Sequence, residues 1–385
     1  MRIYVVQPGD SVWSISRRYG MTPDSIITAN GLETIPTLVV GQSLVIPTGR
    51  EKNFGYIETN AFIQPGTPER DRRLVSEVGE YLTYVTPFSH HVNADGSLTP
   101  LNDDATLAAA RASRTAPLLS VTNISGEATG SNFSTPLIDR ILNDNNLQTT
   151  VINNILSEIK NKGYYGVIVD FERISPENRQ KYNDFLRKLA TSLHAQNYVL
   201  GTALAPKTYD ITTGSWHGAH DYRAHGEIVD FTVIMTYEWG WSGGPPMAVA
   251  PLDQVRQVIS YAASVIPPKK ILMGIPLYGY DWTLPYLPGG EYAKAIGHLE
   301  AVRIASTHGA AIEYDTKAQS PHFNYTDEKG ARHEVWFEDA RSIRAKFLLA
   351  SQYGLRGVSY WVLAQPFPQN WIILDSMFNI TKVIR

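Results

Sequence analysis

The sequence contains no cysteine, which excludes a disulfide framework, a thiolate metal site and a cysteine nucleophile. No stretch of the chain is apolar over the length that crosses a bilayer, and the segment from Met1 to Asp10 lacks the apolar run of a signal peptide. We therefore expect a protein without a membrane span, made without a signal peptide. A chain from which a leader had been removed would look the same.

An excess of charge of one sign is also missing. The formal net charge is -3 and no basic stripe stands out, which argues against a nucleic-acid partner. The loop Gly243–Pro246 lacks the pattern of a phosphate-binding loop, so no nucleotide is implied. His90–His91, His217, His220 and His225 lack the spacing of metal ligands, and we expect them on the surface or at helix caps. Neither a metal nor another cofactor is expected.

What remains is the composition of a globular protein that is rich in aromatic residues. The 385 residues suffice for a large domain and a small one, and 43% of them are hydrophobic while 18% are charged. The chain has 8 Trp and 21 Tyr. Most of these will belong to the core, but their number also suits stacking against sugar rings.

The stretch Gly163–Arg173 (GYYGVIVDFER) is a short apolar strand that ends in two carboxylates, Asp170 and Glu172. Alternate residues of a strand face the same side, so we expect Ile168, Asp170 and Glu172 to point one way and the intervening residues the other. An Asp-x-Glu triplet alone more often marks a solvated turn or a helix start. Here the strand is too apolar for the surface, and two adjacent carboxylates repel each other, which a purely structural site has little reason to keep.

The flanks of this strand read as helices. Val151, Ile155 and Ile159 recur at helical spacing and Gly163 ends the pattern, whereas Ser175 followed by proline predicts an N-cap for a second helix. Similar alternation continues along the chain from Phe54. The apolar segments suited to strands are residues 55–59, 82–86, 117–121, 166–170, 198–203, 230–235, 270–276 and 357–361.

These eight segments, separated by helical patterns, predict an α/β fold, a (β/α)8 TIM barrel, which commonly runs to about 250 residues. The long segment at about 282–338, rich in Gly, Pro and Tyr, is the natural insertion, between strands seven and eight. Barrel enzymes carry their chemistry at the carboxyl ends of the strands. Those ends supply acids, phenols and an indole, a set that suits a glycosidase: Asp170, Glu172, Met235, Tyr237, Glu238, Tyr278 and Trp361.

Residues 1–48 form a separate unit, joined by a polar linker at 49–54 to a domain that covers 55–385. Strands at 3–6 and 43–47 enclose helices at 11–19 and 22–30, so the expected order is βααβ. We expect Trp13 to lie in its core rather than to contact a ligand.

This unit resembles a LysM domain in three segments: Tyr4–Ser16, Asn30–Gly31 and Gly41–Pro47. The resemblance implies binding to polymers that contain N-acetylglucosamine, such as peptidoglycan or chitin. It places the sugar groove between a first turn and a loop at roughly 34–39. The residues of that turn are Gly9, Asp10, Ser11 and Val12.

The strand with the two carboxylates resembles the signature Asp-x-x-Asp-x-Asp-x-Glu of glycoside hydrolase family 18. Tyr165, Ile168, Asp170 and Glu172 occupy its four conspicuous positions, so the first two aspartates are replaced. The Gly-Tyr-Tyr-Gly and Asp-Phe-Glu segments are similar to the branch with bacterial spore-cortex-lytic N-acetylglucosaminidases. The resemblance implies a catalytic barrel in which an α+β insertion at about 282–338 forms one wall of the substrate groove.

The resemblance also implies roles. Glu172 would be the general acid, and burial beside Asp170 should raise its pKa. The substrate's acetamido oxygen would act as nucleophile with net retention, oriented by Asp170 and Tyr237, while Trp361 stacks under the sugar. Met235, Glu238 and Tyr278 would contact substrate.

Two replacements change this picture. Ile168 cannot share a proton, so we expect Asp170 to stay ionised or to find another partner. Glu238 stands where chitinases usually carry aspartate, and its longer side chain could favour a muramic-acid derivative at the neighbouring site.

The expected function is hydrolysis of β-1,4 bonds after N-acetylglucosamine in peptidoglycan, either spore cortex or its fragments. A chitinase and a non-catalytic lectin are the alternatives, although such lectins usually lack the glutamate at the position of Glu172. The resemblance places the protein in the spore coat or at the spore surface, with spore-coat proteins as further partners. If a leader was removed, an extracellular or cell-wall location fits instead.

Overall fold

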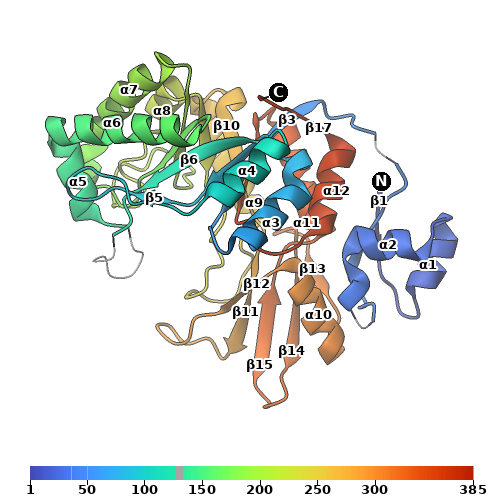
Figure 1. Ribbon diagram of the computed structural model, residues 1–385. Coiled ribbons are helices and arrows are strands. Elements are labelled where there is room, and N and C mark those ends of the chain that lie inside the picture. The colour runs from blue at the N-terminus through green and yellow to red at the C-terminus, as the bar shows by residue number, and fades with distance from the viewer. Residues whose placement is uncertain (36, 50, 126–132, 385) are drawn as a thin grey trace.

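The computed structural model describes residues 1–35, 37–49, 51–125 and 133–384 (Figure 1). Residue 36 of the expected sugar loop, residue 50 of the expected linker, and residues 126–132 and 385 of the expected large domain lie outside the described residues.

The N-terminal unit has the expected βααβ order. Strand β1 (Arg2–Val5) pairs antiparallel with β2 (Ser43–Ile46), and helices α1 (Val12–Tyr19) and α2 (Pro23–Asn30) lie between them in the chain. Ser11 caps α1 and Thr22 caps α2, while Gly20 and Gly31 end these helices in the left-handed conformation, with φ of 65° and 63°. Val6, Ile15, Ile26, Leu44 and Ile46 fill the small core.

Trp13 corrects one expectation, because its side chain is 65% exposed rather than buried. Ile15 faces inward on α1, and Trp13, two positions earlier, lies nearly opposite to it around the helix and therefore points outward. The guanidinium of Arg17 lies over the indole, 5.6 Å from its centroid.

The large domain is a closed parallel barrel, which confirms the predicted fold class. Eight strands follow one another around it, and the last pairs with the first in register Gly357 to Glu58. They are β3 (Tyr56–Ile63), β4 (Tyr84–Pro87), β6 (Ala116–Thr122), β7 (Gly166–Asp170), β8 (Val199–Leu204), β9 (Phe231–Ile234), β10 (Ile271–Pro276) and β16 (Gly357–Trp361). Two short strands, β5 (His90–His91) and β17 (Asn379–Ile380), pair with β6 and β3 at the rim.

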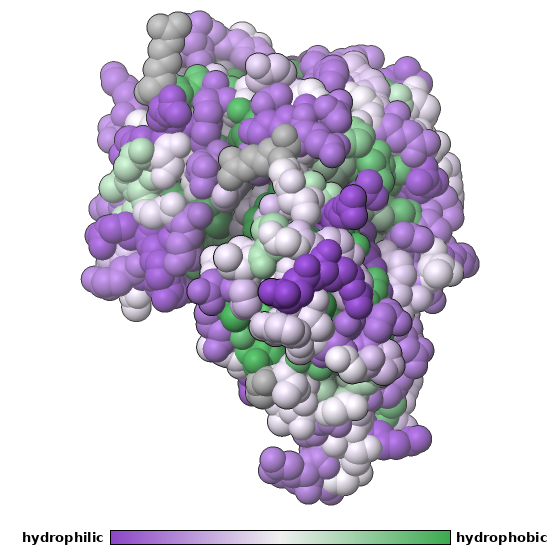
Figure 2. All heavy atoms as spheres, turned by 90° about the vertical axis from the view of Figure 1, so that its right-hand side faces the viewer, coloured by the Kyte–Doolittle hydropathy of each residue, from purple (hydrophilic) through white to green (hydrophobic). Residues whose placement is uncertain are grey.

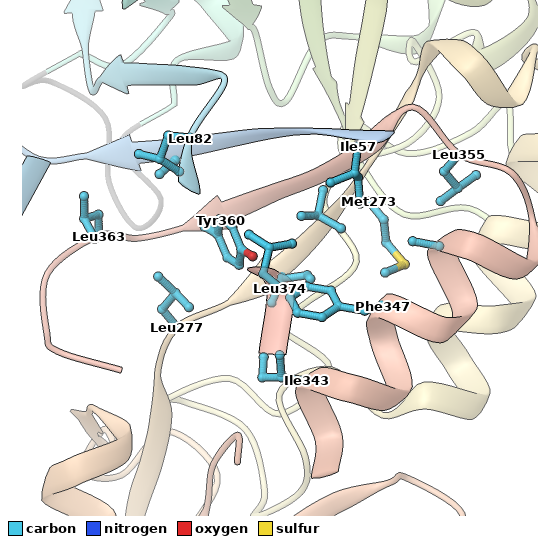
Figure 3. Close-up of a cluster of buried hydrophobic side chains, with 14 of the residues drawn as sticks. Ile57, Leu82, Met273, Leu277, Ile343, Phe347, Leu355, Tyr360, Leu363 and Leu374 are labelled. Carbon is cyan, nitrogen blue, oxygen red and sulfur yellow. The ribbon is translucent and has the colours of Figure 1, made fainter. Parts of the chain in front are cut away.

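Helices cover the outside of the barrel, and apolar side chains fill the space between. The helices are α3 (Pro68–Val78), α4 (Asp104–Ala112), α5 (Thr135–Asn143), α6 (Asn145–Lys162), α7 (Arg179–His194), α8 (Tyr222–Ile228), α9 (Leu252–Val265), α11 (Ala340–Gln352) and α12 (Pro368–Met377). In Figure 3, Phe347 of α11 and Leu374 of α12 lie in one cluster with Ile57 and Met273 from the strands. A separate cluster that includes Ile168 fills the barrel interior.

The entry to α7 differs from the prediction. Ser175 does not cap it, because its hydroxyl hydrogen-bonds the carboxylate of Asp139. A short 3-10 turn (Pro176–Asn178) precedes α7 instead, and proline at its first position fits that turn. The Ser175 hydroxyl, which the local sequence predicts as the cap of the helix, thus donates to Asp139 on α5 instead.

An insertion follows β10 as a five-stranded antiparallel sheet with one helix. It comprises β11 (Gly279–Leu284), β12 (Lys294–Ile296), α10 (His298–His308), β13 (Glu313–Asp315), β14 (Ser320–Thr326) and β15 (Arg332–Trp336). Figure 1 shows it projecting from the barrel on the side next to the N-terminal unit.

The N-terminal unit is packed firmly against the rest of the chain. Val39 belongs to the core of the insertion and Val45 to the large barrel cluster. The backbone of Gly41 approaches so closely that an added Cβ would lie 1.8 Å from the carbonyl oxygen of Ile312. Only glycine fits at this position of the interface.

Gln369 of α12 is the central polar group of this interface and is fully buried. Its amide nitrogen donates to Asn30 Oδ1 at 2.9 Å and to the Ser43 carbonyl at 2.8 Å. Its Oε1 accepts the N–H of Ala340 at 3.0 Å, so one side chain joins α2, β2 and the start of α11.

Replacing Gln369 by leucine is expected to destabilise the protein by about 2–4 kcal/mol, because buried donors and acceptors lose their partners. Thermal or urea unfolding measures the loss, and proteolysis in the linker should become faster. The matched control is Gln352→Leu on an exposed position of α11, for which a change within about 0.5 kcal/mol is expected. Equal losses of stability in the two variants would contradict the role of Gln369 as the central polar group of the interface.

None of the helices within the described ranges is long and apolar enough to cross a bilayer. The face of the molecule that carries the N-terminal unit is mainly hydrophilic, with hydrophobic side chains scattered between the polar ones (Figure 2).

Candidate active site

The strand with the two carboxylates is β7, and its faces divide as alternation predicts. Ile168 lies in the barrel interior, whereas Val167, Val169 and Phe171 belong to the cluster between strands and helices. Asp170 and Glu172 therefore open toward the mouth of the barrel, at its carboxyl-terminal end.

A cavity of about 240 Å³ occupies this mouth. It brings together six of the residues predicted from sequence: Asp170, Glu172, Met235, Tyr237, Glu238 and Trp361. The wall also contains residues that sequence reasoning missed: Phe62, Phe88, Phe133, Pro206 and Trp216. These come from strand ends and loops that are distant in the chain, and only a three-dimensional arrangement brings them to one site.

Burial controls the protonation of the two acids. It raises the pKa of Asp170 to about 7, and burial together with the charge of Asp170 raises the pKa of Glu172 well above its ordinary value. Asp170 Oδ1 has no hydrogen-bond partner among the described residues. Of the two acids, Glu172 is thus the one on which burial and the neighbouring charge both favour the proton. Asp170 is less firmly ionised than the sequence predicts, because no donor compensates for its burial.

Tyr237 and Trp361 lie in the cavity rather than in a closed core. Burial and then the charges of Asp170 and Glu172 raise the pKa of the Tyr237 phenol, which keeps it a hydrogen-bond donor. The indole of Trp361 contacts Phe88 edge to face at 4.8 Å and Phe62 at 5.6 Å between ring centroids. These contacts fix an aromatic surface on one side of the cavity.

Glu238 stands between this cavity and a second one of about 430 Å³. Its Oε1 accepts hydrogen bonds from the hydroxyl of Tyr278 and, at 2.9 Å, from that of Tyr280. Its backbone φ is 68°, a region that bulky residues rarely adopt. Tyr278 lines the second cavity and not the first, whereas Trp361 borders both. The predicted substrate residue Tyr278 therefore lies beside the first cavity and is connected to it through Glu238.

The histidines depart from the expectation. His90, His220 and His225 are buried, at 1%, 1% and 0% exposure, instead of lying on the surface or at helix caps. Burial lowers the pKa of each, so they are neutral imidazoles that hydrogen-bond within the fold. Among the described residues, no group of three or more His, Cys, Asp or Glu side chains could hold a metal ion.

In the N-terminal unit, the side chains of the expected sugar turn serve local structure. Asp10 accepts the hydroxyl of Tyr4 at 2.5 Å and the N–H of Gln7 at 2.8 Å, while Ser11 caps α1. Gly9 has φ 85°, Val12 is half-buried, and the turn offers mainly its backbone to a ligand.

Comparison with known proteins gives two family matches. The sequence model of Glycosyl hydrolases family 18 matches residues 67–365, and that of the LysM domain matches residues 4–47.

Individual proteins match over nearly the whole length. The chain is 44% identical to the cortical fragment-lytic enzyme of Bacillus anthracis over 435 residues, which cover 99% of each chain. It is 42% identical to that of Bacillus subtilis, again over 99% of each. Among solved structures, the spore cortex-lytic enzyme SleL of Bacillus cereus superimposes with a TM-score of 0.92 at 40% identity, covering 99% of both chains.

Proposed function

Because the chain belongs to glycosyl hydrolases family 18 and is a glycosidase with a LysM domain, we propose that it cleaves β-1,4 bonds after N-acetylglucosamine in spore-cortex peptidoglycan or its fragments. The observation that carries the proposal is the cavity in which a protonated Glu172, Asp170 and Tyr237 meet at the barrel mouth. The names of the similar Bacillus proteins support cortex as the polymer.

Glu172 serves as the general acid. Its raised pKa keeps a proton available for the oxygen that leaves the anomeric carbon, and the same carboxylate then takes a proton from the attacking water. Asp170 in its ionised form receives the acetamido N–H of the substrate and offsets positive charge. The phenol of Tyr237 donates to the acetamido carbonyl.

No third carboxylate is needed as nucleophile, because the acetamido oxygen attacks the anomeric carbon and forms an oxazolinium ring. The bond between the anomeric carbon and the leaving sugar breaks as Glu172 protonates the glycosidic oxygen between them. Water then attacks the anomeric carbon from the face that the leaving sugar occupied and opens the ring, so the product keeps the configuration of the substrate. Trp361, fixed by Phe62 and Phe88, provides the apolar surface on which the distorted sugar rests.

Glu238, Met235 and Tyr278 extend the site. Since both phenols of Tyr278 and Tyr280 hold Glu238 in place, its carboxylate can bond a sugar hydroxyl with little loss of freedom. The second cavity beside it then holds a neighbouring residue of the glycan, for which a muramic-acid derivative is the candidate.

The LysM domain binds the polymer through the turn Gly9–Val12. Because this domain is packed rigidly against the barrel, its binding brings the catalytic cavity close to the polymer. The comparisons support a protein associated with the spore, where contacts with coat proteins are also proposed.

Incubation with spore-cortex fragments, vegetative peptidoglycan and chitin oligomers tests the polymer. New reducing ends are identified by mass spectrometry, with the Glu172→Gln variant as the blank. Products that end in N-acetylglucosamine from cortex fragments alone support the proposal, and products from chitin alone indicate a chitinase. Binding without cleavage of any polymer would indicate a lectin.

A further inference from the structure

The hydrogen-bonded ladder of β7 ends at the catalytic carboxylates. Asp170 still pairs in register with Thr122 of β6, but the pairing with β8 ends at Val169 and Thr202. The peptide groups of Phe171 and Glu172 therefore lie beyond the sheet, where buried N–H and C=O groups need other partners.

Asn123, the residue after β6, hydrogen-bonds both the backbone N–H and the backbone carbonyl of Glu172. Its Oδ1 accepts the Glu172 N–H at 2.9 Å, and its Nδ2 donates to the Glu172 carbonyl at 2.8 Å. The same nitrogen donates to the carbonyl of Ser134 at 3.2 Å. Asn123 is fully buried, so no water competes for these bonds.

His220 hydrogen-bonds the backbone on the side of β7 that faces β8. One ring nitrogen, Nδ1, accepts the N–H of Ala205 at 2.9 Å, and the other, Nε2, lies 3.0 Å from the carbonyl oxygen of Phe171. A backbone N–H can only donate, so Nδ1 carries no proton and Nε2–H donates to Phe171. The imidazole thus joins the ends of β7 and β8 where the strands have separated.

Hydrogen bonds from Lys207 hold the loop that contains His220. Lys207 is buried, and its ammonium donates to the carbonyls of His220 at 2.5 Å and Ile211 at 2.8 Å. Pro206, between Ala205 and Lys207, lines the cavity. A neutral His220 fits these contacts, because burial lowers its pKa to about 4.

We propose that His220 and Asn123 are positioning residues that hold Asp170 and Glu172 in their reactive placement through the peptide groups of Phe171 and Glu172. The inference rests on the proposed function. Catalytic groups need placement to a fraction of an ångström, and a displacement of about 1 Å can cost about a hundredfold in rate. The two side chains act on the backbone and do not touch the reacting atoms.

Two substitutions separate the hydrogen bonds of His220. In His220→Gln the amide nitrogen reaches the place of Nε2 and keeps the donor to Phe171. In His220→Asn the amide oxygen reaches the place of Nδ1 and keeps only the acceptor for Ala205. Both remove the ring, so both lose stability to a similar degree.

On cortex fragments, His220→Asn is expected to lower kcat by about 10- to 100-fold with KM within about threefold, while His220→Gln stays within about threefold of wild type. Asn123→Ala should resemble His220→Asn. The control is His225→Asn, because His225 is equally buried and bonds Thr202 rather than the end of β7. It should lose stability and keep kcat.

Circular dichroism and unfolding curves establish that each variant is folded at the assay temperature. A folded His220→Asn with wild-type kcat would overturn the inference, as would equal losses in His220→Asn and His220→Gln. If wild type and His225→Asn cleave none of the three polymers, the proposed function fails and the inference with it. The two failures are therefore distinguishable.

Discussion

The Glu172→Gln variant is expected to bind cortex fragments and to cleave them at least about a hundredfold, and up to about ten thousandfold, more slowly than the wild type. Glutamine has the shape of a protonated glutamate but cannot release a proton to the leaving oxygen. Burial and the charge of Asp170 raise the pKa of Glu172 in the wild type, which lowers the cost of having the proton in place before the reaction. The loss should appear in kcat, with KM little changed.

Glu177→Gln provides the matched control, because Glu177 is exposed on the 3-10 turn that follows the site. It should cleave at the wild-type rate. If Glu172→Gln retained more than a tenth of the wild-type kcat, another group would have to protonate the leaving oxygen. The cavity offers Glu238 for that role, and Glu238→Gln would then show the larger loss.

Asp170→Asn is expected to be more stable than the wild type above neutral pH, although its activity falls. The folded protein holds the pKa of Asp170 at about 7, above the ordinary 3.8, because burial disfavours its charge. Below pH 3.8 the acid is neutral in both the folded and the unfolded chain and costs nothing. As the pH rises toward about 7, only the unfolded chain ionises freely and the wild type loses stability.

The difference is largest above a pH of about 7, where asparagine avoids a cost of up to about 4 kcal/mol. Urea unfolding of both proteins at pH values of about 3.5, 6 and 8 measures this difference. We expect coincident curves at the lowest pH and a growing advantage for Asp170→Asn at the higher ones. A variant that is less stable than the wild type at the highest pH would contradict the burial of an uncompensated charge.

The barrel and its catalytic strand could be predicted from the sequence because their signals are local. Strand periodicity alone separates Ile168 and Asp170 from Phe171, and the structure has the same division. The carboxyl ends of parallel strands meet at one mouth, so residues such as Tyr237 and Trp361 could be assigned to a common site without knowledge of the loops.

The remainder depends on contacts between distant segments. Phe88 and Trp216 reach the cavity from loops whose course no local pattern predicts. His220 was expected at the surface or at a helix cap, because a histidine in a polar loop carries no sign of the peptide groups it will meet. For Trp13 a signal did exist, since the helical spacing that turns Ile15 inward turns Trp13 outward.

The central claim is that the fold keeps a proton on Glu172 at the barrel mouth. Carbon-13 NMR of protein labelled at the glutamate side-chain carboxyl, assigned by difference with Glu172→Gln, follows this group through a pH titration. We expect a midpoint well above the ordinary glutamate value that moves down in Asp170→Asn, since the neighbouring charge is then removed. A midpoint near the ordinary glutamate value of about 4.3, unchanged in that variant, would contradict it.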